Sequence, residues 1–231
     1  MGVIDIVLVL VFLYGIYSGF QSGFLKMFSN FIILLITTLI AGKLSDIMFG
    51  LLYNVFPFFN FSGKTEGLKA LNIIVWKLVL YILIFAVILT LIKSVLTKFK
   101  IKEKINDSMI NVNIIGKIFG SILSIPLVFT LVFNAILILL IPFLNFRLLT
   151  DSKVANIIMT KTPILANANR NLYNNQTFII NRINKKDNTI KGYKKLNKDI
   201  VDNMLDTNLV SKEIIETLED GNKLLGTRNK K

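Results

Sequence analysis

Residues 118–144 read IFGSILSIPLVFTLVFNAILILLIPFL, which is 27 consecutive positions without a charged side chain. A helix rises about 1.5 Å per residue and the hydrocarbon core of a bilayer is about 30 Å thick, so about 20 apolar residues are enough to cross it. The sequence therefore predicts an all-α, polytopic membrane protein with four transmembrane helices. The other three candidate spans are residues 6–20 with 3–5 added, residues 27–42, and residues 78–92 extended back to about 71.

Two of these segments carry residues that complicate a simple span. Charged residues crowd both ends of the second segment, namely Lys26, Lys43 and Asp46. A re-entrant helix, or one whose lysines snorkel to the interface, is therefore an alternative there. In the last segment we expect Pro126 to kink the first turns and Pro142 to mark the helix end.

The ends of the first segment argue against a cleaved signal peptide. No basic stretch precedes it and no A-x-A-like site follows it. We therefore expect the first helix to remain in a multi-pass protein of the plasma or inner membrane.

The composition removes most enzyme chemistry. Hydrophobic residues make up 53% of the 231 positions, and the chain has neither Cys nor His. Disulfides, thiolate metal sites and cysteine nucleophiles are excluded, and the commonest general base and metal ligand is absent. The remaining Ser, Lys, Asp and Glu show no catalytic spacing. We expect no catalytic residue, cofactor or metal site.

A change in composition divides the chain into a membrane domain at residues 1–145 and a polar, basic, Asn/Lys-rich tail at residues 146–231. From Arg147 onward the tail holds 16 of the 27 basic residues. We expect two or three short amphipathic helices, joined by loose linkers, with no large core of their own. Apolar residues recur there at helical spacing, at Ile200, Val201, Met204, Leu205 and Leu209, and Gly221 and Gly226 are candidate helix ends.

Four spans place the loops at residues 21–26 and 93–117 on one side, and the N-terminus, residues 43–70 and the tail on the other. The lysine counts near the spans are almost equal on the two sides, so the positive-inside rule alone does not decide. A dense cluster favours residues 93–117 inside and the tail outside, because anionic lipid headgroups attract juxtamembrane lysines. Its members are Lys93, Lys98, Lys100, Lys102 and Lys104.

The alternative for this cluster is a solvated loop without a lipid role. The total charge of +13 also raises nucleic acid as a partner. Much of that charge flanks membrane segments, where lipid headgroups are the nearer counter-charge. We therefore expect the lipid bilayer as the partner and no specific nucleic acid.

Small residues recur at every fourth position in the first and last spans. This spacing lets two helix backbones approach closely, which is one way in which helices associate in lipid. It predicts a helix–helix seam, within the chain or in a homo-oligomer, although glycine is also simply common in membrane helices. The residues are Gly15, Gly19 and Gly23 in the first ridge, and Gly116, Gly120 and Ser124 in the second.

Asp5 is the one acidic residue of the first span. A carboxylate at the centre of a membrane helix costs about 2.5–3.5 kcal/mol, so it usually has a partner or a function. Two interpretations remain open. Asp5 lies at the interface, favoured by the positive end of the helix dipole, or it is a buried polar group with a proton-linked role.

Two blocks resemble a known family. Asp5 is followed by Gly15-x3-Gly19-Phe20-x2-Gly23-Phe24, and a later block reads Asn113-Ile-Ile-Gly116-Lys-Ile-Phe-Gly120. Together with the order of four spans, they resemble the colicin V production (CvpA) family over about residues 1–145. The chain departs from that pattern at Gln21 and Ser22, where the family usually has a basic residue, and in its long tail.

The resemblance implies a bacterial, non-enzymatic membrane protein that acts in toxin or bacteriocin production or export and in envelope maintenance. Some relatives carry an extracytoplasmic domain after the four helices, which agrees with a tail outside and an extracytoplasmic protein partner. The alternative function is a small transporter or channel subunit, with Asp5 as its membrane-embedded ionisable group.

Overall fold

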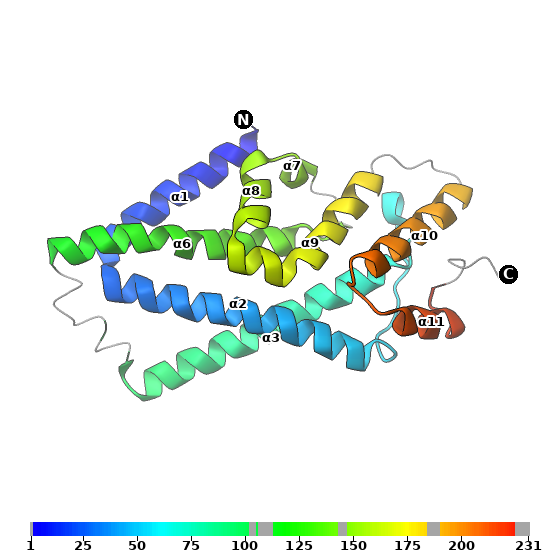
Figure 1. The fold of residues 1–231 in the computed structure, drawn as a ribbon, viewed down its shortest axis with the longest axis horizontal. Coiled ribbons are helices and arrows are strands. Elements are labelled where there is room, and N and C mark those ends of the chain that lie inside the picture. Colours follow the sequence, from blue (N-terminus) through cyan, green and yellow to red (C-terminus); the bar gives the residue numbers. More distant parts are fainter. Residues whose placement is uncertain (1, 102–104, 106–112, 143–146, 184–189, 225–231) are drawn as a thin grey trace.

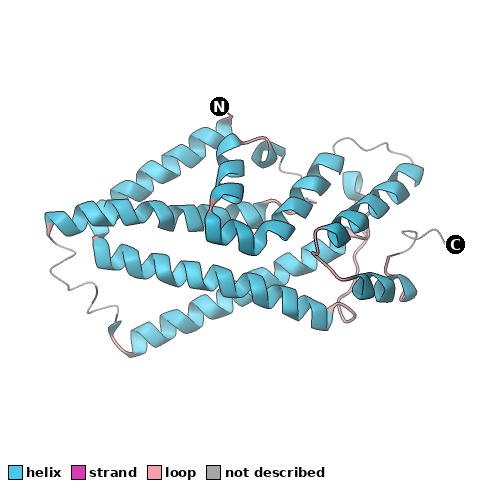
Figure 2. Cartoon of the chain, viewed as in Figure 1, coloured by secondary structure: helices cyan, strands magenta, loops and turns pink. Residues whose placement is uncertain are grey.

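The computed structural model is built from helices and their connections. It describes the chain in five stretches, and no strand occurs within them (Figure 2). The fold class predicted from the sequence is therefore confirmed. The described residues are 2–101, 105, 113–142, 147–183 and 190–224.

Four helices are long and apolar enough to cross a membrane, as the sequence predicted. Their lengths run from 20 to 29 residues, and a helix of about 20 residues spans about 30 Å. They are α1 (Val3–Ser22), α2 (Phe24–Leu52), α3 (Leu71–Lys98) and α6 (Ile114–Leu139).

The second helix corrects the weakest of the sequence expectations. α2 is one continuous helix of 29 residues, and Lys26, Lys43 and Asp46 all lie inside it. The re-entrant alternative is therefore wrong. The last helix is also shifted from its expected bounds, since α6 begins before residue 118, continues through Pro126 and ends before Pro142.

α6 packs against α1 and α2, and α2 packs in turn against α3 (Figure 1). Gly23 joins α1 to α2 with a φ of 77°, a conformation that glycine adopts without steric cost. We call the end of the bundle that carries Gly23, Lys98 and Ile114 the basic end. The C-terminal segment, defined as the described residues from 147 to 224, lies away from it (Figure 1).

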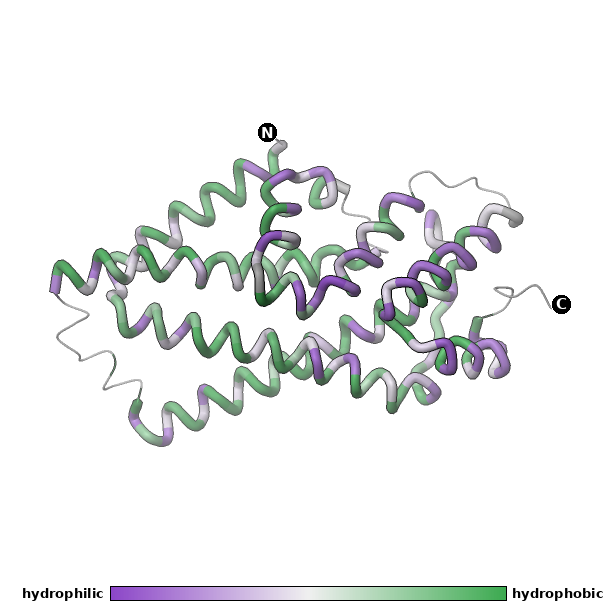
Figure 3. The backbone as a smooth tube through the Cα atoms, viewed as in Figure 1, coloured by the Kyte–Doolittle hydropathy of each residue, from purple (hydrophilic) through white to green (hydrophobic). Residues whose placement is uncertain are grey.

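The C-terminal segment forms five helices within the described residues, the longest of 21 residues, where two or three short ones with loose linkers were expected. Figure 3 shows many hydrophilic residues along these helices, whereas the four long helices are mostly hydrophobic. Ile180, Ile200 and Leu218 nevertheless join the same hydrophobic cluster as Ile74 and Leu137 of the membrane helices. The helices are α7 (Arg147–Thr150), α8 (Lys153–Lys161), α9 (Pro163–Ile183), α10 (Ile190–Asp206) and α11 (Lys212–Asp220), which ends at Gly221.

Candidate functional site: the junction of the first helix and the C-terminal segment

Asp5 lies in the first turn of α1 and is almost completely buried, with 2% of its surface exposed. The Gly2 N–H donates a hydrogen bond of 2.9 Å to Asp5 Oδ2. This bond satisfies one of the backbone N–H groups that have no partner at a helix N-terminus. Asp5 therefore lies at the N-terminal end of the helix dipole, as the first interpretation expected, and it is buried among polar partners, as the second expected.

The second oxygen of Asp5 binds the start of α8. Asp5 Oδ1 accepts a bond of 2.6 Å from the Ser152 hydroxyl and one of 3.1 Å from the Val154 N–H. Ser152 is the N-cap of α8, and its Oγ also accepts from the Ala155 N–H at 3.0 Å. The carboxylate therefore completes the cap of a helix about 150 positions away in the sequence, where the helix dipole favours negative charge.

The two carboxylate oxygens of Asp5 thus accept three hydrogen bonds, all from this chain. Two donors belong to the C-terminal segment and one to the N-terminus of α1. Leaving a buried donor without its acceptor costs about 1–3 kcal/mol. These hydrogen bonds therefore fix the start of α8 against the N-terminus of α1.

Lys77 makes a second such contact, which the sequence interpretation missed. This α3 side chain is 3% exposed, and its Nζ lies 2.5 Å from Asp46 Oδ1 and donates to the Leu209 carbonyl at 2.6 Å. The Phe49 ring lies 5.5 Å from the same Nζ. The sequence does contain a signal for this contact. Lys77 is a charged residue within an otherwise apolar span, and such residues usually have a partner.

Amide side chains of the C-terminal segment reach backbone groups at the ends of membrane helices. Asn197 accepts from the Ala70 N–H at the N-cap of α3 and donates to the Gly67 carbonyl. Gln176 Nε2 donates to the Leu137 carbonyl in the last turn of α6 at 2.9 Å. These helix ends leave backbone groups without intrahelical partners, so the C-terminal segment satisfies them where it packs.

The small residues predicted to form a seam lie where α1 meets α6. A Cβ built on Gly19 would fall 2.5 Å from the Gly120 carbonyl oxygen and 2.6 Å from Ser124 Cβ. One built on Gly120 would fall 2.8 Å from the Gly23 carbonyl carbon. One built on Gly15 would meet a methyl group of the α6 residue Val128. The two backbones are thus too close for a side chain at Gly19 or Gly120, whereas at Gly15 the obstacle is the Val128 side chain.

The remaining small residues predicted to line the seam are also buried. Gly23 is buried at the turn, and Gly116 and Ser124 are buried on α6. The two ridges pack against each other within one chain. In the described residues, neither ridge is left exposed to form this seam with a second copy of the chain.

The predicted headgroup lysines are far from this junction. Lys93 and Lys98 lie in the last turns of α3, and Lys100 follows the helix with a φ of 52°. All three are exposed. Lys102 and Lys104 fall outside the described residues.

The described part of the chain has no cluster of three or more His, Cys, Asp or Glu side chains that could hold a metal ion.

Comparison with protein-family models, with curated proteins and with solved structures finds no match for this chain.

Proposed function

We propose that the chain is a non-enzymatic integral membrane scaffold of the CvpA type, acting in toxin production or export and in envelope maintenance. The observation that carries the proposal is the Asp5 junction, a buried carboxylate that fixes α8 onto α1. A scaffold needs a rigid connection between its membrane helices and the segment that meets a partner. We infer that the C-terminal segment presents its polar faces to a protein outside the cytoplasm.

The geometry of Asp5 favours this role over that of a proton carrier. A carrier has to gain and lose its partners, and it needs access to water on at least one side. Asp5 is 2% exposed and accepts three hydrogen bonds, two of them from backbone N–H groups. The alternative of a small transporter or channel subunit requires this site to open.

The test compares Asp5→Asn with Ser152→Ala in cells that lack the wild-type chain. In Asp5→Asn the amide keeps the size of the side chain but brings its own N–H donors into a site lined by donors. If the chain is a scaffold, both variants loosen α8 and impair envelope integrity together. Envelope integrity is measured by entry of an impermeant dye, and α8 is followed by hydrogen exchange. Asp202→Asn, an exposed carboxylate of α10, is the matched control and should behave as wild type.

The transporter alternative predicts a different pattern. Asp5→Asn would then abolish a proton-dependent flux in vesicles, while Ser152→Ala would preserve it. A dye barrier that stays intact in both variants, despite faster exchange in α8, would contradict the scaffold proposal.

A further inference from the structure

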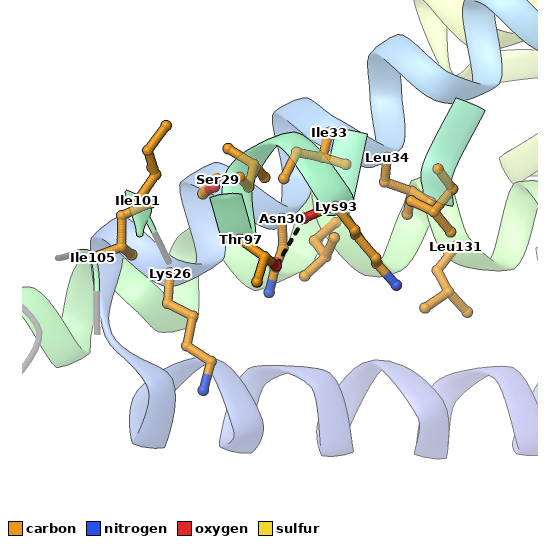
Figure 4. A pocket seen from close by; sticks show the side chains of 13 residues that line it. Lys26, Ser29, Asn30, Ile33, Leu34, Lys93, Thr97, Ile101, Ile105 and Leu131 are labelled. Carbon is orange, nitrogen blue, oxygen red and sulfur yellow. Dashed lines mark hydrogen bonds between the residues drawn. The ribbon is translucent and has the colours of Figure 1, made fainter. Parts of the chain in front are cut away.

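A cavity of about 600 Å³ lies between α2, α3 and α6 toward the basic end (Figure 4). α2, α3 and α6 all contribute lining residues, and α2 contacts both of the other two helices. Its volume is within the range of about 300–1,000 Å³ that is typical of small-ligand sites. It has no part in the Asp5 junction.

The lining is mostly aliphatic, with Lys26, Ser29, Asn30, Lys93 and Thr97 as its polar members. The α6 residue Leu131 is 53% exposed, so the cavity opens at the surface of the bundle there. In Figure 4 the Lys26 and Lys93 side chains extend to the same side, Lys26 at the end that carries Ile105 and Lys93 toward Leu131, with Asn30 between them. The aliphatic lining includes Ile33, Leu34, Leu89, Leu127 and Leu131.

The charge around this opening has one sign. Within the described parts of residues 20–30, 90–101 and 113–120, five residues are lysines and none is acidic. Lys26 lies in the first turn of α2, close to the turn at Gly23. A basic site of this kind between membrane helices matches an anionic headgroup.

We propose that this cavity binds one anionic phospholipid from the surrounding bilayer. Lys26, Asn30 and Lys93 contact the anionic headgroup, and the aliphatic side chains of α2, α3 and α6 hold the upper part of an acyl chain. The lining comes mainly from three helices that are long and apolar enough to cross a membrane, which favours a lipid over a water-soluble anion. The proposal goes beyond the scaffold function and does not depend on it.

The test uses the full-length protein in non-ionic detergent, titrated with lipid and followed by native mass spectrometry. The probes are phosphatidylglycerol and phosphatidylcholine with identical chains. We expect one tightly retained phosphatidylglycerol, and weaker binding of phosphatidylcholine by about tenfold or more. A lysine near an anionic headgroup is worth about 1 kcal/mol, so the double variant Lys26→Gln/Lys93→Gln should lose about tenfold or more in affinity.

Lys98→Gln is the matched control, because this exposed lysine of α3 does not line the cavity. It should bind phosphatidylglycerol within about twofold of wild type. If the double variant fails to fold, the lipid affinity is measured for Lys93→Gln alone, which we expect to fold because Lys93 is exposed. It should lose several-fold in affinity.

Three results would overturn the proposal. Equal retention of the two lipids would remove charge selection. An equal loss in the Lys98→Gln control would assign the effect to general surface charge. Displacement of the lipid by free glycerol 3-phosphate would identify a site for small anions instead.

Discussion

Asp5 and Lys77 are the two charged residues among the buried side chains of the described chain. Both come from helices long enough to span a membrane, and both bind the C-terminal segment. Burying a charge is costly unless it is paired and hydrogen-bonded. Their partners explain why these charges are tolerated, and they define two of the points at which the membrane helices hold the segment that follows.

Replacing Lys77 with methionine should loosen the connection between α10 and α11. Methionine fills a similar volume but leaves the Leu209 carbonyl without its donor, at a cost of about 1–3 kcal/mol. We expect a lower free energy of unfolding and faster hydrogen exchange around residues 207–211. Asp46→Asn is the comparison, because its amide oxygen can still accept from Lys77 Nζ and 58% of that side chain is exposed, so we expect a smaller loss than for Lys77→Met. Equal losses in the two variants would contradict the assignment of the main contribution to the Leu209 contact.

Tyr173 gives the fold a dependence on alkaline pH. Burial raises the pKa of this α9 hydroxyl, which donates to Asn156 Oδ1 at 3.2 Å. In the unfolded chain tyrosine loses its proton near pH 10. Above that pH the unfolded state binds fewer protons than the folded state, so the free energy of unfolding falls as pH rises.

Tyr173→Phe removes this titration. Between about pH 9 and pH 11, the free energy of unfolding should fall less steeply for the variant than for wild type, as measured by chemical denaturation in detergent. Identical slopes for the two proteins would show that Tyr173 ionises equally in the folded and unfolded states.

The α1–α6 seam is the contact between elements that is most sensitive to added volume. Gly19→Ala and Gly120→Ala each place a Cβ within 3 Å of backbone across the seam. Overpacking of this kind costs about 1–3 kcal/mol, and isoleucine at either position should cost more. Thermal unfolding in detergent measures the loss, and size-exclusion chromatography measures any change in oligomeric state.

Gly50→Ala is the control for helix propensity. A Cβ at this α2 position meets nothing within 4 Å. Alanine should therefore raise the free energy of unfolding by as much as about 1 kcal/mol, because it is the better helix former. If all three glycine variants had similar stability, close packing at the seam would be contradicted.

The sequence predicts elements better than it predicts the contacts between them. A bilayer demands a long apolar helix wherever the chain crosses it, so uncharged runs locate all four spans. The partners of Asp5 and Lys77, in contrast, lie far from them in the sequence. Ser152 lies 147 positions away and the Leu209 carbonyl lies 132 positions from Lys77, and no local pattern encodes either pairing.

The same limit applies to the C-terminal segment, which forms five helices within the described residues where two or three were expected. The recurrence through Ile200 and Met204 predicts an apolar helix face, and both residues are buried on α10. The surface that covers this face comes from the membrane helices and from the rest of the segment. Periodicity shows that a face is apolar, but it does not say which element buries it.

At the scale of the whole molecule, charge is distributed unevenly along the bundle. The basic end carries five lysines and no acidic residue within its described part, whereas the region of the C-terminal segment carries both signs. The positive-inside rule alone does not decide, because the lysine counts near the spans are almost equal on the two sides, but the density of lysines favours the basic end in the cytoplasm. With four crossings, we then expect the C-terminal segment outside, where the proposed protein partner would meet it.

Cysteine labelling in intact cells tests this orientation, because the chain has no Cys of its own. Lys98→Cys reports the basic end and Asn222→Cys reports the C-terminal segment, and both side chains are exposed. A membrane-impermeant maleimide should label position 222 in intact cells and position 98 only after permeabilisation. The reverse pattern would invert the protein and place the C-terminal segment against cytosolic partners. Labelling of both positions in intact cells would contradict four membrane crossings, because α6 is the one span between these two sites and must place them on opposite sides.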